Sequence, residues 1–412
     1  SEEAGAYNAD EEITRLQFAS ILCRMLNITG QKTGEGIFKD IARRHYLAGK
    51  IEELRKMGIM NGTAEDMFGK DEKISSMQAA VVFLRALGYE NLAEYKGGYP
   101  TGYLAAARGT DLLKGISASD KALTYSQAMT LFYNFAGCEL YQVRAVSSDG
   151  LTMETVEGKT VLKVYHNIAK TKDVLSATAD TSLYGENGTP SGEVRIGSKN
   201  LKYDGSDKKQ YIGYEIEGYY NTDSEFLVWW DITDKNDVTF ISDEDFSGYK
   251  NGGIEYYGKS KMNYKKIPSG ADIIYNNKFM SFNTAVFSGF NTGNIKLVDN
   301  NGDGTVEAII INNYFNRVAE SKSAAGKTVR FADSKGSVSF DKKYDEYSFL
   351  DSNGEDISSD RISIGNVLSF MESADEKKAV IYVSAASVVG KLERIEANGA
   401  GKKLRIGGTD YK

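Results

Sequence analysis

The most constraining feature of this sequence is a helix-starting pattern that occurs three times in its first third. Each time an apolar residue precedes Thr or Ser, a Gln follows three positions later, and apolar residues continue at helical spacing. The segments are ITRLQFASILCRMLNI (13–28), ISSMQAAVVFLRALGY (74–89) and LTYSQAMTLFYNFAGC (123–138). This is a capping box, in which the hydroxyl accepts a backbone N–H and the Gln side chain reaches back. It predicts capped helices after Thr14, Ser75 and Thr124.

Two related segments lie between these helices. They are FKDIARRHYLAGKIEELRKMGIMNG (38–62) and YPTGYLAAARGTDLLKG (99–115). Each reads as an aromatic start, a helix, and a Gly where the chain turns through positive φ. The unit of helix, Gly-containing loop and capped helix recurs about every 50 to 60 residues, and repeats of this size stack to share a core. We therefore expect a helical domain over residues 1–139.

The order of short motifs in this region resembles the S-layer homology domain. The matching elements are Ile13-Thr14-Arg15, Phe38-Lys39-Asp40, His45-Tyr46 and Gly58-Ile59-Met60-Asn61-Gly62. The stretch GGYPTGYLAAA (97–107) is similar to the third repeat of clostridial members of that family. The resemblance covers about residues 6–138. It implies three repeats in a pseudo-threefold bundle, with grooves between repeats that hold a pyruvylated secondary cell-wall polysaccharide.

The resemblance also implies a set of glycan-binding residues. Arg15 would be the cation that holds the pyruvate carboxylate, since an Arg fork suits a carboxylate. Tyr46 and Tyr103 would replace the usual Trp against a sugar face, and Asp40 and Gly62 would complete the groove. Thr14 belongs to the same motif, although capping alone is a sufficient role for it.

The repeats depart from the family pattern at the position of the Arg. The family writes Thr-Arg-Ala-Glu, whereas this chain has Thr-Arg-Leu-Gln at 14–17, Ser-Ser-Met-Gln at 75–78 and Thr-Tyr-Ser-Gln at 124–127. At most one groove therefore keeps the cation. The alternative is a bundle retained only for packing, with Arg15 a solvated surface charge.

After Gly137 the sequence alternates apolar and polar residues, with turn signals and no strong helix pattern. YIGYEIEGYYNTDSEFLVWW (211–230) aligns without gaps on SIGNVLSFMESADEKKAVIY (363–382), so that Gly213 meets Gly365 at an offset of 152 residues. VRIGSKNLKY (194–203) is similar to LRIGGTDYK (404–412). Because that segment precedes the Ile-Gly strand in the first copy, the chain stops where a further unit would begin, and we expect either a longer parent protein or trimming.

These patterns predict a multidomain α + β protein, in which a pseudo-threefold helical S-layer homology bundle precedes tandem small all-β modules of barrel or sandwich type. A β-rich domain is expected over 140–325. A second β module, related to part of the first, is expected over 326–412.

A calcium loop is one interpretation of LVDNNGDGTVEAIIINN. Asp299, Asn301, Asp303, Thr305 and Glu307 follow the ligand order of an EF-hand loop, with Gly304 at position 6. Position 12, which should be Glu, is Ile310, and the flanks read as strands. Two readings stay open: a hairpin whose Asn-Gly and Asp-Gly residues supply positive φ, or a shortened calcium loop between strands.

Composition excludes several function classes. A formal charge of −7 and a pI near 5.3 argue against nucleic acid as a partner. No run of 18 apolar residues exists to span a bilayer. The two histidines, His45 and His166, supply no metal or triad signature, and His166 falls in a predicted β segment. Cys23 and Cys138 read as small buried hydrophobes, with a disulfide between them left open.

The sequence therefore predicts a non-enzymatic, extracellular protein of the cell wall or S-layer. The helical bundle would attach to the secondary cell-wall polysaccharide. The β modules would act as a spacer, as a lattice contact through self-association, or as an adhesion surface. Two alternatives stay open: an adhesin whose β part binds an extracellular carbohydrate or a host protein, and a hydrolase carried on the same anchor.

Overall fold

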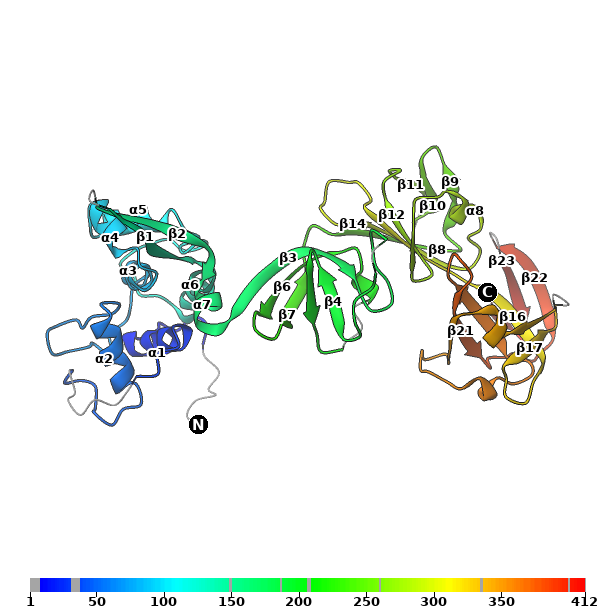
Figure 1. Ribbon diagram of the computed structural model, residues 1–412, viewed down its shortest axis with the longest axis horizontal. Coiled ribbons are helices and arrows are strands. Elements are labelled where there is room, and N and C mark those ends of the chain that lie inside the picture. Colours follow the sequence, from blue (N-terminus) through cyan, green and yellow to red (C-terminus); the bar gives the residue numbers. More distant parts are fainter. Residues whose placement is uncertain are drawn as a thin grey trace. The chain divides into compact units, whose positions relative to one another are not determined.

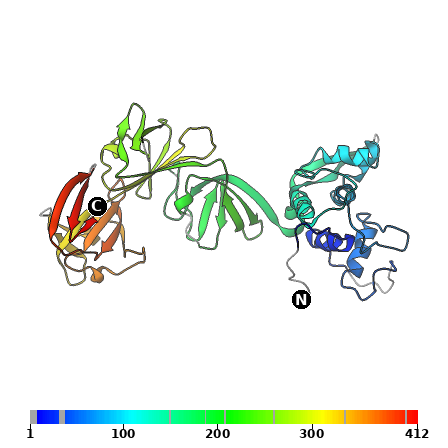
Figure 2. The ribbon, with the colours of Figure 1, turned by 180° about the vertical axis from the view of Figure 1, so that it is seen from behind.

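The computed structural model describes residues 8–30, 38–147, 150–185, 187–205, 209–258, 261–333, 336–398 and 401–411. The fold is mostly β-sheet with few helices, and its strands form several small sheets (Figure 1). The chain divides into two compact units. The first is Ser1–Ala169 with Tyr220–Ser224, and the second is Lys170–Tyr219 with Glu225–Lys412. The longer helices belong to the first unit, as the reverse view also shows (Figure 2).

The first unit combines helices with one two-stranded sheet. Its elements are α1 (Arg15–Met25), α2 (Ala48–Lys56), α3 (Ser76–Ala86), α4 (Glu90–Tyr95), α5 (Thr101–Ala107), α6 (Tyr125–Gly137), β1 (Glu139–Ser147), β2 (Gly150–Thr160) and α7 (Val161–His166). Among the described residues, none of the helices combines the length and the apolar content that a bilayer crossing needs.

The three predicted capping boxes are confirmed at the starts of α1, α3 and α6. In the first, Thr14 Oγ1 accepts the N–H of Gln17 at 3.2 Å, and Gln17 Oε1 accepts the N–H of Thr14 at 2.8 Å. The other two boxes repeat this exchange. Each box bonds amides that the first helical turn otherwise leaves without partners, so the helices begin where the sequence predicts.

The residues just before these caps form a closed ring of backbone hydrogen bonds. Ile13 N–H donates to Leu123 O at 3.0 Å, Leu123 N–H to Ile74 O at 2.9 Å, and Ile74 N–H to Ile13 O at 3.5 Å. Isolated β-bridges follow the same cyclic order: Glu12 with Thr124, Thr14 with Lys73, and Ser75 with Ala122. Each helix start is therefore bonded to both of the others.

Beneath the ring, one aromatic cluster holds the three helices together. Phe18, Phe83 and Phe132 are 0–4% exposed, and their ring centroids lie 4.8 to 5.2 Å apart. Such aromatic contacts add to the free energy gained by burying apolar area. The three helices that share the repeated sequence pattern, α1, α3 and α6, therefore also share one core.

The first unit extends beyond the predicted end of the helical domain at residue 139. Leu140 and Val161 belong to the helical core, and the N–H of Tyr141 donates to Leu87 O at 2.8 Å. The prediction of β structure without helices after Gly137 is wrong at Val161–His166, which forms α7. His166 is the last residue of that helix, and its Nε2 lies 3.0 Å from Met25 O.

Both cysteines are buried and free. Burial raises the pKa of the Cys23 thiol to about 12 and that of Cys138 to about 11. The prediction of small buried hydrophobes is confirmed, and the disulfide alternative is not.

The second unit begins with a closed five-stranded barrel in the order β3-β4-β5-β7-β6. Its strands are β3 (Ile168–Ala177), β4 (Glu193–Ile196), β5 (Lys199–Lys202), β6 (Glu215–Asn221) and β7 (Phe226–Ile232). A five-stranded sheet, β13-β12-β15-β14-β8, and a three-stranded sheet, β11-β10-β9, follow. Their elements are β8 (Asp237–Ser242), β9 (Phe246–Lys250), β10 (Gly253–Tyr257), β11 (Met262–Lys266), β12 (Asp272–Tyr275), β13 (Lys278–Met280), α8 (Ala285–Ser288), β14 (Gly293–Asp299) and β15 (Ala308–Asn313).

A six-stranded sheet, β18-β17-β16-β20-β21-β19, and a final three-stranded sheet, β22-β23-β24, complete the second unit. Their elements are β16 (Phe315–Lys322), β17 (Thr328–Phe331), β18 (Ser337–Ser339), α9 (Phe340–Lys343), β19 (Glu346–Leu350), β20 (Val367–Glu372), β21 (Lys378–Ser384), β22 (Leu392–Asn398), β23 (Gly401–Ile406) and β24 (Thr409–Tyr411). Because β16 pairs with β17 and β20, this sheet begins before the predicted boundary at residue 326.

The predicted internal repeat is confirmed as a structural repeat. Strands β6 and β20 begin 152 residues apart, and so do β7 and β21. Gly213 and Gly365 precede them with φ of +89° and +88°, a region that favours glycine. The same backbone bend therefore leads into the strand pair in both copies.

Candidate functional site

Arg15 begins α1 and is enclosed by backbone and aromatic groups. The residue is 7% exposed, its Nε donates to Phe68 O at 3.1 Å, and its Nη2 donates to Asn61 O at 2.8 Å. The guanidinium carbon lies 5.4 Å from the centroid of the Phe68 ring. Burial lowers the pKa of Arg15, while the carboxylates of Glu72 and Asp40 act to raise it. The alternative of a solvated surface charge is therefore wrong.

Asp40 fixes the loop that holds Arg15. Its Oδ1 accepts the N–H of Phe68 at 2.8 Å, and its Oδ2 accepts those of Gly69 at 2.8 Å and Lys70 at 2.9 Å. Burial acts to raise the pKa of Asp40, but these backbone amides outweigh it and hold the pKa below its usual range. Asp40 is thus a carboxylate that accepts three amides and orients the Phe68 carbonyl toward Arg15.

Gly62 and Tyr46 lie in the segment that follows Asp40 in the chain. A Cβ on Gly62 would lie 2.3 Å from Met67 O and 2.6 Å from the Phe38 ring, so only Gly fits there. Tyr46 is 66% exposed and stacks on His45 with 4.8 Å between ring centroids. Tyr46 is thus the predicted aromatic residue that presents its ring to solvent.

Tyr103 lies in the core of the first unit. It is 1% exposed, and its hydroxyl lies 3.4 Å from Glu90 Oε1, an oxygen that also accepts from Arg85 Nε at 2.9 Å. Burial raises the pKa of Tyr103. The expectation that Tyr103 offers its ring to a sugar does not fit this enclosure.

The first helical positions of α1, α3 and α6 carry different side chains, Arg15, Ser76 and Tyr125, all of them buried. Ser76 Oγ donates to Ser117 O at 3.0 Å, so its neutral hydroxyl takes the place of the guanidinium. Of the three equivalent positions, the one in α1 alone carries a cation that can attract an anion.

A second candidate site is the loop between β14 and β15. Asp299 is 1% exposed; its Oδ1 accepts the N–H of Gly302 and its Oδ2 that of Gly304, both at 2.7 Å. Gly302 and Gly304 have φ of +75° and +87°, which the tight turn requires. Ile310 is buried within β15, so it takes no part in the loop, and the predicted strand flanks are confirmed.

Three carboxylates gather in this loop. Ligand oxygens of Asp299, Asp303 and Glu307 all lie within 4.8 Å of one another. Burial, followed by the charges of Asp299 and Asp303, raises the pKa of Glu307. The amide and hydroxyl of Thr305 lower the pKa of Asp303. Clustered hard oxygens are the ligand set that calcium prefers.

Backbone amides also bond to the carboxylates of this loop. Glu307 Oε2 accepts the N–H of Asn300 at 3.0 Å, and its Oε1 accepts from Asn301 Nδ2 at 3.2 Å. Asp303 Oδ1 accepts the N–H of Thr305 at 2.7 Å. Each of these Glu307 and Asp303 oxygens keeps a second lone pair, so the bonds fix the loop without using up its capacity for a cation.

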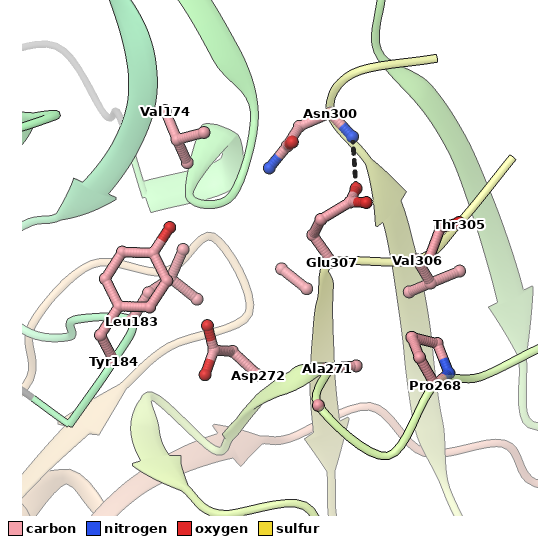
Figure 3. Close-up of a pocket in the computed structure, with 12 residues that line it drawn as sticks. Val174, Leu183, Tyr184, Pro268, Ala271, Asp272, Asn300, Thr305, Val306 and Glu307 are labelled. Atoms are coloured by element: carbon pink, nitrogen blue, oxygen red, sulfur yellow. Dashed lines mark hydrogen bonds between the residues drawn. The ribbon is translucent and has the colours of Figure 1, made fainter. Parts of the chain in front are cut away.

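Glu307 also lines a cavity of about 410 Å³. Asp272 lies on the same cavity, and Leu183 and Tyr184 approach from the opposite wall (Figure 3). Burial raises the pKa of Asp272, and its N–H donates to Glu307 O at 2.9 Å. The cavity thus adds a further carboxylate beside the acidic loop.

The sequence of this chain is similar to those of three bacterial proteins named for the cell surface, the cell wall or the surface layer. A cell surface protein of Thermoanaerobacter kivui is 25% identical over 169 residues, which are 40% of this chain and 21% of that protein. The middle cell wall protein of Brevibacillus brevis is 20% identical over 466 aligned positions, covering 99% of this chain and 44% of that protein. The surface layer protein of Brevibacillus choshinensis is 21% identical, covering 99% and 41%. The chain is an extracellular protein of the cell wall or surface layer.

This surface protein spans less than half the length of each of these relatives. No family model matches it. The relatives are named as surface and wall proteins, which agrees with the prediction of a non-enzymatic role.

Sequence reasoning missed two contributors to the candidate sites of the surface protein. Glu72 faces Arg15 electrostatically, and Asp272 joins the cavity beside the acidic loop. Glu72 stands three residues before Ser75, next to a recognised repeat, so its position was a usable signal. Asp272 begins a strand far from the loop in sequence, and no spacing rule connects it to Glu307.

Proposed function

We propose that the first unit is an S-layer homology bundle that binds the secondary cell-wall polysaccharide, and that the second unit projects from it as a spacer and lattice contact. The observation that supports this is the ring of backbone hydrogen bonds through Ile13, Leu123 and Ile74. We propose that the polysaccharide binds between successive repeats of this cyclic arrangement.

The guanidinium of Arg15 has chemistry that suits an acidic sugar. Two backbone carbonyls accept from Nε and Nη2 of Arg15, and we propose that Nη1 donates to the ligand. A pyruvate carboxylate held there would gain a charge-assisted hydrogen bond. Glu72 and Asp40 already balance part of this charge, so we propose that Tyr46, by packing on a sugar face, supplies much of the affinity.

Co-sedimentation with purified Gram-positive cell-wall sacculi tests this function. We expect the intact chain to pellet with sacculi that carry their secondary polysaccharide and to stay in solution with sacculi stripped of it. Free pyruvylated polysaccharide should compete for binding. Equal retention on stripped and intact sacculi would reject the polysaccharide as the ligand.

We further propose calcium as a structural ligand of the second unit, held by Asp299, Asp303 and Glu307 with Asn301 and Thr305 in the same loop. The supporting observation is the approach of the three carboxylates. Burial, followed by the charges of Asp299 and Asp303, raises the pKa of Glu307. A divalent cation would remove this repulsion and stiffen the connection between β14 and β15.

A further inference from the structure

The second unit contains a hairpin that occurs three times, although the sequence alone aligned only parts of it. Three inner strands carry similar tripeptides, Val194-Arg195-Ile196 in β4, Val329-Arg330-Phe331 in β17 and Leu404-Arg405-Ile406 in β23. Each pairs with the strand before it, β3, β16 and β22 respectively. These pairs are called hairpins one, two and three below.

The three hairpins share one irregular register. Leu175 pairs with Ile196, Ala319 with Phe331, and Leu392 with Ile406, and a bulge follows at once in all three outer strands. The residue after each tripeptide donates its N–H to the carbonyl just before Leu175, Ala319 or Leu392. The three bonds are Gly197 N–H to Val174 O, Ala332 N–H to Val318 O and Gly407 N–H to Lys391 O, each at 3.0 Å. A shared bulge and bond identify the three hairpins as copies of one element.

In hairpins one and two, the Ile-Gly bend and its strand close the outer edge. Gly213 N–H donates to Leu175 O, and Leu175 N–H to Tyr214 O, both at 2.9 Å. In hairpin two, Gly365 N–H donates to Ala319 O at 2.8 Å, and Ala319 N–H to Asn366 O at 2.9 Å. Strand β20 then continues the pairing along β16, and β6 closes the barrel beside β3.

Hairpin three has no such cover among the strands that the structure describes. Strand β22 is the edge of the sheet β22-β23-β24 and pairs with β23. Leu392 is 50% exposed, whereas its equivalents Leu175 and Ala319 are 1% and 2% exposed. Ile395, which pairs with Leu404 on the same face, is 55% exposed. A face that is core in two copies is open in the third.

The open edge carries charges that disfavour indiscriminate pairing. Arg394 and Glu396 form an ion pair at 3.1 Å along β22, and Arg405 reaches Glu393 at 3.3 Å. Charged side chains on an edge strand discourage association with unrelated strands. A specific partner must therefore match both the apolar face around Leu392 and the bulged backbone.

We propose that the outer edge of β22 receives a β-hairpin of the same type as β6–β7 and β20–β21, with an Ile-Gly bend at its start. The Gly amide of that hairpin donates to Leu392 O, and its first strand runs antiparallel to β22. Its alternate apolar residues cover Leu392 and Ile395. In the two earlier hairpins the third residue after the bend glycine, Ile216 or Leu368, is 0% exposed. This strand addition is independent of wall binding by the first unit.

The test uses the full chain and a synthetic peptide of residues 209–232, which carries Gly213 and the strands β6 and β7. Amide hydrogen exchange across residues 391–395 is measured with and without the peptide. The account predicts that saturating peptide slows exchange at Leu392 about tenfold or more, since the amide gains a hydrogen-bond partner. A peptide with Gly213→Val should give no protection, because the bend needs φ near +89°.

Two variants of the chain provide the matched comparison. Leu392→Asp places a charge on the open face and should abolish protection by the peptide. Val389→Asp alters an apolar residue that is 96% exposed just before β22, and protection should remain. Exchange across residues 367–384 should be unchanged in both, which checks that the neighbouring sheet is intact.

The proposal is overturned if the peptide leaves exchange at Leu392 unchanged in the unaltered chain, or if the Gly213→Val peptide protects equally. Exchange at Leu392 could instead slow as the concentration of the chain alone rises, and this slowing could be lost in Leu392→Asp. That result would overturn the proposal and assign the edge of β22 to a second copy of this chain.

Discussion

At the scale of single residues, charged side chains in this protein hold the backbone in place. Arg15 donates to the Asn61 and Phe68 carbonyls. Asp40 accepts the amides of Phe68 and Gly69 in the same loop. The sequence marked both residues as functional because of their motif. It carried no information about the burial of Arg15, because that burial depends on a loop more than 40 residues away.

Replacing Arg15 by Ala should destabilise the first unit. The buried carbonyl of Phe68 would lose its donor, and such an unsatisfied group costs about 1–3 kcal/mol. Denaturant unfolding followed by helical circular dichroism measures the change. Arg24→Ala is the control, because Arg24 lies on the same helix and is exposed. Equal stability of the two variants would contradict the structural role of Arg15.

The acidic loop should respond to calcium and to pH in a defined direction. Because the folded pKa of Glu307 is raised, the cation-free protein loses stability as pH rises from the unfolded pKa through the folded pKa. Calcium needs the ionised form, so its stabilising effect should disappear as pH falls through the same range. Calcium at about 100 times its Kd would add about 2.7 kcal/mol.

Thermal melting of Glu307→Gln provides the check. In chelator at neutral pH this variant should melt at or above the temperature of the unaltered chain, since repulsion with Asp299 and Asp303 is removed. In millimolar calcium it should lose the rise in Tm that the unaltered chain shows. Asp234→Asn, in an exposed loop, should keep that rise. If calcium does not raise the Tm of the unaltered chain, the proposed calcium site is wrong.

At the scale of elements, local signals predicted well where one interaction decides the structure. Capping boxes fixed the starts of α1, α3 and α6, and the aligned Ile-Gly segments located the repeated strand pairs β6–β7 and β20–β21. Helix α7 was missed because its β-branched and aromatic residues favour strands. Its signals were Thr160, whose hydroxyl accepts the Lys163 amide at 3.3 Å, and Asn167, which ends the helix with φ of +56°.

The two bend glycines offer a matched pair of substitutions. Gly365→Ala should lower the free energy of unfolding by about 1–2 kcal/mol, because an L residue is strained at φ +88°. No steric clash adds to this cost, since no atom lies within 4 Å of the added Cβ. Gly213→Ala should cost more, since its Cβ would lie 3.0 Å from that of Ala308. Denaturant unfolding of both variants tests the order. A smaller loss for Gly213→Ala would contradict the described packing.

At the scale of the whole molecule, the sequence separated helical from β-rich regions but misplaced the boundaries. The hairpin β1–β2 and α7 complete the helical core through Leu140 and Val161, and β16 belongs to the sheet that follows it. Both errors have one cause. A change in local periodicity marks a change of secondary structure, whereas a domain ends where long-range packing ends.

The central proposal is that the first unit attaches the chain to wall polysaccharide and that the exposed ring of Tyr46 packs on a sugar. Co-sedimentation with polysaccharide-bearing sacculi should be compared for Tyr46→Ala and Tyr133→Ala, because the two tyrosines are 66% and 63% exposed and neither substitution opens the core. Tyr46→Ala should weaken binding about tenfold or more, which corresponds to about 1.4 kcal/mol. Tyr133→Ala should bind like the unaltered chain. Equal binding by both variants would contradict the account.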